Sequence, residues 1–264
     1  MKILRDGATH TVKELDVTVS LAGDFETSYT AGDNSFVVAT DTMKNTVNVL
    51  ASRHLGLETE RFAQTLVTHF LTKYPQVKAA TVKTSERVWD RLNIDGTPHP
   101  HSFGGGQVAR PVTTVTATAD GVFTESGITD LLILKSSASG FEGFPRCEFT
   151  TLPETYDRIF ATSLSATWTW SAAPADYTAA NRTLLAALLA PFALNFSPSV
   201  QTTLFQMGEA ALLTVPAISR IHLSMPNKHC LPIDLTRFGE ENHGDLFLPT
   251  DEPHGLIEAT VERE

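Results

Sequence analysis

One order of elements occurs twice along this chain, and this repeat constrains the fold more than any single motif does. Each half contains strands, then two helices, then further strands, as judged from the spacing of apolar residues. The clearest strand covers residues 14–21, where alternating apolar and polar side chains predict burial on one face. The repeat predicts an α+β fold of two tandem domains, residues 1–120 and 121–264, with a boundary near Asp120 and Gly121.

In the first half, residues 1–4 are expected to pair with the 14–21 strand through a turn at Asp6 and Gly7. A hairpin whose first strand begins at residue one looks cut short. Thr40 is a plausible N-cap of the first helix, and the run Gly104–Gly106 is expected to be a mobile turn, because no phosphate-loop Lys follows it. The elements expected in this half are a short strand at 35–39, helices at 41–50 and 58–73, and strands at 77–91 and 108–119.

In the second half, a long excursion at 136–157 separates the strands, and long loops in compact domains are often functional. Ser197 and Pro198 are expected to supply a cap and a first-turn proline to the last helix. The elements expected in this half are strands at 121–125, 129–135 and 161–171, helices at 177–194 and 199–213, and strands at 218–225, 230–235 and 256–262.

Composition excludes several classes of function. The 20 basic and 30 acidic residues give a net charge of -10, which argues against nonspecific nucleic-acid binding and against an anionic membrane surface. No apolar run approaches the roughly 18 residues of a membrane span. Cys147 and Cys230 lack a C-x-x-C partner, so both are interpreted as reduced, buried thiols of a cytoplasmic protein.

The stretch Phe141–Arg158 carries the most suggestive chemistry. It combines aromatic rings, Gly and Pro residues that fix a loop, and a terminal arginine. A ring for stacking and a guanidinium that forks toward an anionic edge suit a flat, polar heterocycle. The alternative is an ordinary loop with core Phe residues and an arginine in a salt bridge.

Several short segments resemble signatures of urate oxidase (uricase), in the order of that family and across nearly the whole chain. They are Val38–Asp41, Lys44–Thr46, His99–Phe103, Leu134–Ser136, Thr150–Leu152, Asp157–Arg158, Ser199–Gln201, Pro226–His229 and Gly255–Ile257. The resemblance implies two tunnelling-fold (T-fold) domains, whose antiparallel sheets line a barrel made by the subunits together, with the helices outside. It also implies a homotetramer with active sites at subunit interfaces.

The same resemblance implies a mode of substrate binding. Phe141 would stack on the purine ring, and Arg158 and Gln201 would grip one edge of it. The backbone amides of Val200 and, from the neighbouring subunit, Asp41 would hold other polar atoms of urate.

The remaining implied roles concern the reaction. Leu152 would wall the pocket, Asn227 would bind oxygen or water above the ring, and Thr40 and His229 would belong to a proton relay. No strong metal or flavin motif is present, and the family works without a cofactor, because deprotonated urate itself supplies the electrons to O2. The products would be 5-hydroxyisourate and hydrogen peroxide.

The residues taken singly leave other interpretations open. Arg158 can pair with Asp157 or Glu154, Gln201 can be an exposed helix residue, and residues 227–229 can form a turn. His99 and His101 suggest a metal site, but a third ligand is not evident.

The family pattern also departs from this sequence at one point. Uricases carry a catalytic lysine in an N-terminal Tyr-Gly-Lys segment that is not found here, and Lys2 lies too late in the strand to take that role. The expectation is a preserved pocket with reduced turnover. Alternatives are therefore a purine-binding T-fold protein without turnover, a metal-dependent pterin or purine hydrolase, and an interaction module.

Overall fold

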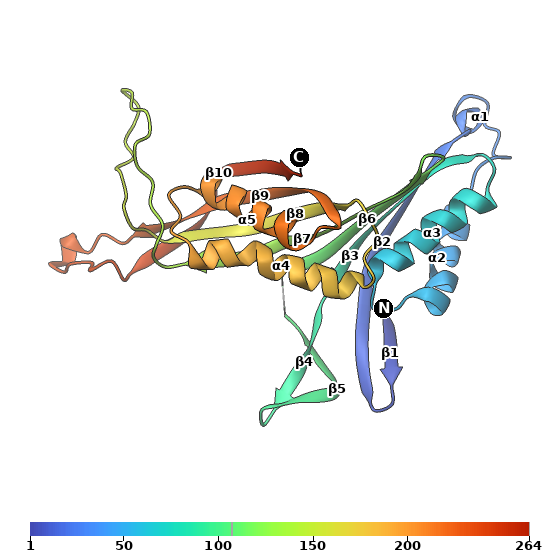
Figure 1. The fold of residues 1–264 in the computed structure, drawn as a ribbon, viewed down its shortest axis with the longest axis horizontal. Coiled ribbons are helices and arrows are strands. Elements are labelled where there is room, and N and C mark those ends of the chain that lie inside the picture. Colours follow the sequence, from blue (N-terminus) through green and yellow to red (C-terminus); the bar gives the residue numbers. More distant parts are fainter. Residues whose placement is uncertain (107, 264) are drawn as a thin grey trace. The chain divides into compact units, whose positions relative to one another are not determined.

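The computed structural model describes residues 1–106 and 108–263, and it combines helices with antiparallel strands, as the α+β prediction requires (Figure 1). The chain falls into two compact units. Unit 1 comprises Met1–Ile128 and Trp168–Asn181, and unit 2 comprises Thr129–Thr167 and Arg182–Glu264. Strands β7 (Gly121–Lys135) and β8 (Phe160–Trp170) and helix α4 (Tyr177–Leu194) contribute residues to both units. The boundary near residue 120 stays a prediction.

Unit 1 is built on an antiparallel sheet in which β1 pairs with β2, β2 with β3, and β3 with β6. Helix α3 packs on β3 and β6, and its buried Phe62, Leu66 and Phe70 meet Val82 and Val115 of the sheet in one core cluster. The elements of this unit are β1 (Lys2–Asp6), β2 (Thr9–Gly23), α1 (Glu26–Thr30), α2 (Thr40–His54), α3 (Thr59–Lys73), β3 (Val77–Arg87), β4 (Trp89–Ile94), β5 (Thr97–Gly105) and β6 (Arg110–Thr118).

Unit 2 contains the long antiparallel pair β9 (Ile218–Pro232) and β10 (Phe247–Glu262), whose register breaks between Thr250 and Gly255. Helix α5 (Val200–Thr214) packs on this pair, and a short 3-10 helix spans Thr236–Phe238. A Cβ on Gly208 would lie 2.6 Å from a methyl of Val261, so glycine at this position lets α5 approach β10 closely.

The predicted N-terminal hairpin is confirmed, and it gives Lys2 a structural task. Residues of β1 and β2 pair in register from Lys2 with Lys13 to Asp6 with Thr9. The ammonium of Lys2 donates hydrogen bonds to the carbonyls of Ala51, Ser52 and Leu55 at 2.9, 3.1 and 2.8 Å, at the negative end of α2.

Several local predictions were wrong. Residues 35–39 form no strand but a turn and an extended segment that leads into α2. Thr40 is the first residue of that helix and not its N-cap, which is Ala39. Gly104 and Gly105 belong to β5 and pair with β4 rather than forming a mobile turn. At Gly105 a Cβ would lie 3.3 Å from the ring of Trp89, which explains a glycine inside this strand.

The predicted strands also differ from the observed ones. The two strands predicted at 218–225 and 230–235 are replaced by the single strand β9, and the strand predicted at 77–91 is divided between β3 and β4. For β7 the sequence suggested two strands at 121–125 and 129–135. The structure has one continuous strand with Asp130 at a φ of 59°, so the interruption in the apolar pattern is a local irregularity. Within the described residues, no helix is both long enough and apolar enough to cross a membrane.

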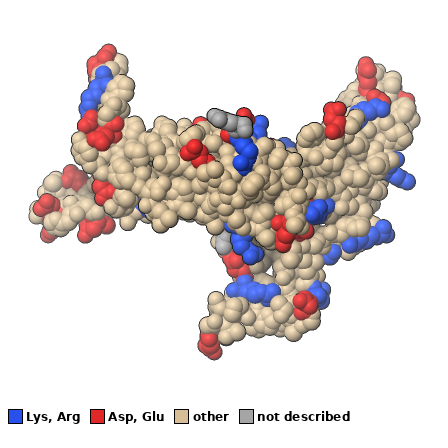
Figure 2. All heavy atoms as spheres, in the orientation of Figure 1, with Lys and Arg blue, Asp and Glu red and all other residues tan. Residues whose placement is uncertain are grey.

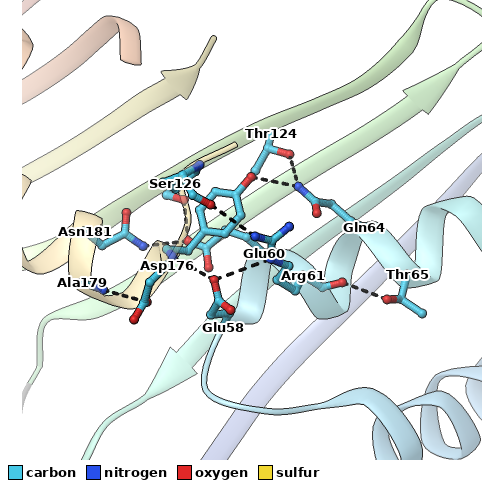
Figure 3. Close-up of polar contacts among 12 residues, drawn as sticks. Glu58, Glu60, Arg61, Gln64, Thr65, Thr124, Ser126, Asp176, Ala179 and Asn181 are labelled. Atoms are coloured by element: carbon cyan, nitrogen blue, oxygen red, sulfur yellow. Dashed lines mark hydrogen bonds and ion pairs between the residues drawn. The ribbon is translucent and has the colours of Figure 1, made fainter. Parts of the chain in front are cut away.

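A buried polar network stabilises unit 1 at the start of α3 (Figure 3). The carboxylate of Glu60, which is 4% exposed, accepts hydrogen bonds from the Ser126 hydroxyl at 2.5 Å and from the Asn181 amide at 2.7 Å. The indole of Trp170 donates to the same Ser126 oxygen at 2.8 Å, and that of Trp168 donates to the Asn181 carbonyl oxygen at 3.1 Å. Since each partner is held by a further bond, the network fixes α3 against β7, β8 and α4.

Candidate functional site

The loop that leaves β7 folds back on itself, and this places Phe141 beside Arg158. Phe141 and Thr155 exchange two backbone hydrogen bonds of 2.7 and 3.0 Å, as in an antiparallel bridge. The Arg158 N–H donates to the carbonyl of Ser139 at 2.8 Å. The two ends of residues 141–158 are therefore fastened to each other, although the segment contains little regular structure.

The Arg158 guanidinium lies against the Phe141 ring, with its Cζ 5.8 Å from the ring centroid. Both side chains are half-buried, and the Arg158 Nε is a fully buried donor with no partner among the described residues. Burial lowers the pKa of Arg158, but a guanidinium stays protonated in proteins. Within the described part of the chain Arg158 forms no ion pair, so the proposed pairing with Asp157 or Glu154 is not seen. A buried cationic donor is thus left for an acceptor that residues 1–106 and 108–263 do not supply.

A second fastening joins this loop to the start of α5. Gly140 N–H donates to the Ser197 carbonyl at 2.8 Å, and Ser197 N–H donates to the Ala138 carbonyl at 2.9 Å. Ser139 and Ser197 thereby form a parallel bridge. The first residues of α5 are consequently held close to the residues that flank Phe141.

Helix α5 begins at Val200, and Ser199 is its N-cap, with a side chain that accepts from Thr202 N–H at 3.1 Å. The predictions that Ser197 caps the helix and that Pro198 lies in its first turn were wrong, because both residues precede the cap. Ser197 is fully buried, and its hydroxyl accepts from Thr203 at 2.7 Å. Val200 and Gln201 are the first helical residues, so their amides have no acceptor within the helix and lie at its positive end. The Val200 side chain is buried, and that of Gln201 is exposed.

Asp157 connects the end of the loop to its beginning through hydrogen bonds. Its carboxylate accepts from the Ser137 hydroxyl at 2.8 Å and from the Ala138 N–H at 2.7 Å. These bonds, first that from Ser137, lower the pKa of Asp157. Asp157 therefore stabilises the segment that leads into Ser139 and Phe141.

The other predicted site residues are placed as follows. Leu152 is exposed on the loop, and Asn227 and His229 are half-buried on β9, opposite Gly255 and Thr250 at the register break. In the described residues, no hydrogen bond or ion pair connects their side chains to Phe141 or Arg158, so the structure leaves their roles untested.

Thr40 and Asp41 belong to unit 1, at the exposed start of α2. The Asp41 carboxylate accepts from the Asn45 amide at 3.0 Å and lies 3.4 Å from the Lys44 ammonium. Thr40 borders a groove of about 480 Å³ between β2 and α2, which is lined chiefly by apolar side chains.

The histidines that suggested a metal lie in unit 1, where the rings of His99 and His101 are 4.5 Å apart and that of His10 is 5.9 Å from His101. Over residues 1–106 and 108–263, no group of at least three His, Cys, Asp or Glu side chains is arranged to hold a metal ion. The charges visible in Figure 2 are of both signs and interspersed, so any anion would meet local groups such as Arg158 rather than a basic surface.

The sequence did not indicate that Ser139, Gly140 and Ser197 shape this site. For Gly140 the sequence does contain a signal, because a glycine directly before Phe141 can indicate a close approach of the backbone. A Cβ there would lie 2.9 Å from the Thr155 carbonyl oxygen and 3.2 Å from the Phe196 ring. Only glycine fits this crossing without a shift of the backbone.

Comparisons with known proteins agree with one another. The family model described as Uricase matches residues 1–116 and 124–258. The uricase of Arthrobacter globiformis is 40% identical over 266 residues, which cover 100% of this chain and 86% of that protein, and the uricase of Dictyostelium discoideum is 40% identical over 256 residues, which cover 96% and 89%.

Solved structures give the same result. The crystal structure of the Arthrobacter globiformis uricase matches with a TM-score of 0.94 and covers 100% of this chain and 90% of that one. A uricase from Bacillus fastidious matches at 26% identity with a TM-score of 0.83, covering 94% and 81%.

Proposed function

This chain belongs to the uricase family, and we propose that it oxidises urate with O2 and water to 5-hydroxyisourate and hydrogen peroxide without a cofactor. Its activity is that of a urate oxidase, an oxidoreductase of purine degradation, and its fold is the T-fold of that family. The particular products, the lack of a cofactor and the role of each residue are our proposal.

The observation that carries the proposal is the buried, unpartnered Nε of Arg158 beside the Phe141 ring. A ligand stacked on the ring lies about 3.5 Å above it. The Arg158 Cζ is 5.8 Å from the Phe141 centroid, so the guanidinium is close enough to donate to an acceptor-rich edge of a ligand stacked on that ring.

Gln201 and the amide of Val200 complete the proposed grip. An amide side chain offers a donor and an acceptor together, which match an N–H and C=O edge of urate. The unpaired amide at the start of α5 donates to a further oxygen and places partial positive charge near the urate anion. Leu152 closes the pocket wall.

In the proposed reaction, the protein orients urate and transfers protons. Deprotonated urate gives up electrons to O2, which is reduced to hydrogen peroxide. Water adds to the oxidised ring, so urate, O2 and H2O balance 5-hydroxyisourate and H2O2. We assign proton shuttling to Thr40 and His229 and the binding of O2 or water to Asn227.

The proposed assembly is a homotetramer with active sites at subunit interfaces. Thr40 and Asp41 would enter each site from the neighbouring subunit, which agrees with their position in unit 1 while the stacking and gripping residues lie in unit 2. We place the enzyme in the cytoplasm, because Cys147 and Cys230 are free thiols. The expectation that both are buried was wrong, since Cys147 is exposed and Cys230 is half-buried.

Substitution of Arg158 by Gln tests the proposal. Two charge-assisted hydrogen bonds of about 1.5–3 kcal/mol each are removed. The KM for urate, followed by loss of its absorbance and by peroxide release, is therefore expected to rise by about 10²–10⁴-fold. The control is Arg237→Gln, since Arg237 also lies over a phenyl ring, at 4.8 Å from the Phe238 centroid, but is exposed. A KM within threefold of the unsubstituted value for Arg158→Gln refutes the assignment.

A further inference from the structure

The ring of Phe141 is not isolated on its loop but is one layer of a stack. The Phe144 ring lies parallel to it, with centroids 5.0 Å apart and an angle of 10° between the planes. The guanidinium of Arg146 lies over Phe144, 5.2 Å from that ring's centroid, while Arg158 lies over Phe141. Parallel rings at this separation are in offset-stacked contact.

The backbone between the two rings is shaped to bring them together. Gly143 has a φ of 70°, which side-chain-bearing residues rarely adopt, and a Cβ there would meet nothing within 4 Å. Glycine is therefore required by conformation and not by space. The Gly143 N–H also donates to Glu154 at 3.4 Å, from the opposite strand of the loop. The turn thus returns Phe144 onto Phe141.

We propose that Phe144 is a positioning residue for urate oxidation, which fixes the plane of Phe141 by covering one of its faces so that the purine stacks on the other. The inference rests on the proposed role of Phe141. The backbone of Phe141 is held by Thr155, but a backbone bridge does not set the rotation of a half-buried ring. Among the described residues, Phe144 is the aromatic ring in contact with Phe141, and the Arg158 Cζ lies 5.8 Å from the Phe141 centroid.

The role predicts a kinetic signature that a loss of folding would not give. Phe144 does not touch the reacting atoms, so its loss weakens binding of the ground state and of the transition state alike, which raises KM and leaves kcat unchanged. An offset aromatic pair contributes the equivalent of about a two- to tenfold change in affinity. Phe144→Leu keeps apolar bulk without a flat face, and Phe144→Tyr keeps the flat face.

The test compares four variants of the full chain: Phe144→Leu, Phe144→Tyr, Phe141→Leu and Phe149→Leu. Phe149 is the matched control, because it belongs to the same loop but is 83% exposed. Readouts are kcat and KM for urate, the dissociation constant of xanthine as a flat purine, and the thermal midpoint.

The expected result for Phe144→Leu is a two- to tenfold rise in both KM and the xanthine dissociation constant, with kcat within twofold and the thermal midpoint unchanged. Phe144→Tyr and Phe149→Leu behave as the unsubstituted protein. An unchanged or lowered KM in Phe144→Leu, beside a raised KM in Phe141→Leu, overturns the inference while the proposed function stands. An unchanged KM in Phe141→Leu overturns both.

Discussion

Removal of the Glu60 carboxylate should destabilise unit 1 strongly, although it lies outside the proposed site. Glu60 is 4% exposed and its carboxylate accepts from Ser126 and Asn181 (Figure 3). In Glu60→Ala the buried Ser126 hydroxyl and the half-buried Asn181 amide both lose their acceptor. Since each such bond to a charged group contributes about 1.5–3 kcal/mol, we expect a loss of about 3–5 kcal/mol in the free energy of unfolding.

Glu60→Gln should cost less, about 1–3 kcal/mol, because Ser126 and Asn181 both donate to the same oxygen, Oε1, and the amide oxygen of glutamine can take that position and accept both bonds. What the variant loses is the negative charge, which makes each of these bonds stronger than a bond between neutral groups. The order of stability is expected to be unsubstituted protein, then Glu60→Gln, then Glu60→Ala.

The assay is thermal and denaturant unfolding at one fixed protein concentration, with the exposed Glu209→Gln on α5 as control. For Glu60→Ala the expected fall in melting temperature is about 6–20 °C. A double-mutant cycle with Asn181→Ala should give a coupling of about 1–3 kcal/mol between the two side chains. A coupling near zero, or a Glu60→Ala variant as stable as the control, would refute the account of this network.

Three further changes concern the loop and α5. Ser199→Ala removes the cap that accepts from Thr202 N–H and should cost about 1 kcal/mol, measured by denaturant unfolding. Gly140→Ala places a Cβ 2.9 Å from the Thr155 carbonyl oxygen and should raise the KM for urate at least tenfold; steady-state kinetics that match the unsubstituted enzyme would contradict the crossing described here. The lowered pKa of Asp157 means that its contribution is complete above roughly pH 4 and is lost as pH falls through the lower folded-state pKa. Hydrogen exchange at the Ala138 amide should accordingly quicken on acidification, after correction for intrinsic exchange, and in Asp157→Asn this pH dependence should be absent.

Periodicity predicted the helices well, because their apolar faces are buried by their own sheets. The predicted helix 177–194 has those bounds in the structure, and 58–73 differs by one residue. The predictions failed where the structure that a residue type usually favours differs from the structure that its position in the fold imposes. Glycine runs are typical of turns, yet Gly104 and Gly105 lie in a strand, where the missing side chain of Gly105 leaves room for the Trp89 ring. Threonine is a residue type that often caps helices, yet Ala39 and not Thr40 occupies the N-cap position of α2.

The sequence predicted candidate side chains for the site, but it did not predict the backbone contacts that hold them. The resemblance to a family supplied Phe141, Arg158 and Gln201, but no pattern in the sequence indicates that Ser139 bridges Ser197. That bridge joins residues far apart in the chain through backbone atoms, which any residue type provides. The stack with Phe144 depends in the same way on a positive φ at Gly143, which composition suggests but does not fix.

The pairing of Ser139 with Ser197 also bears on how this pocket can be redesigned. The groups that would contact a ligand project from a scaffold of main-chain bonds, so exchanging Phe141 or Gln201 alters preference without dismantling the support. A library aimed at other flat heterocycles should therefore randomise those two side chains and keep residues 138–140 and 197 as they are. An insertion beside residues 138–140 or 197 would move Phe141 away from the start of α5, and both the affinity and the selectivity for the ligand would be lost.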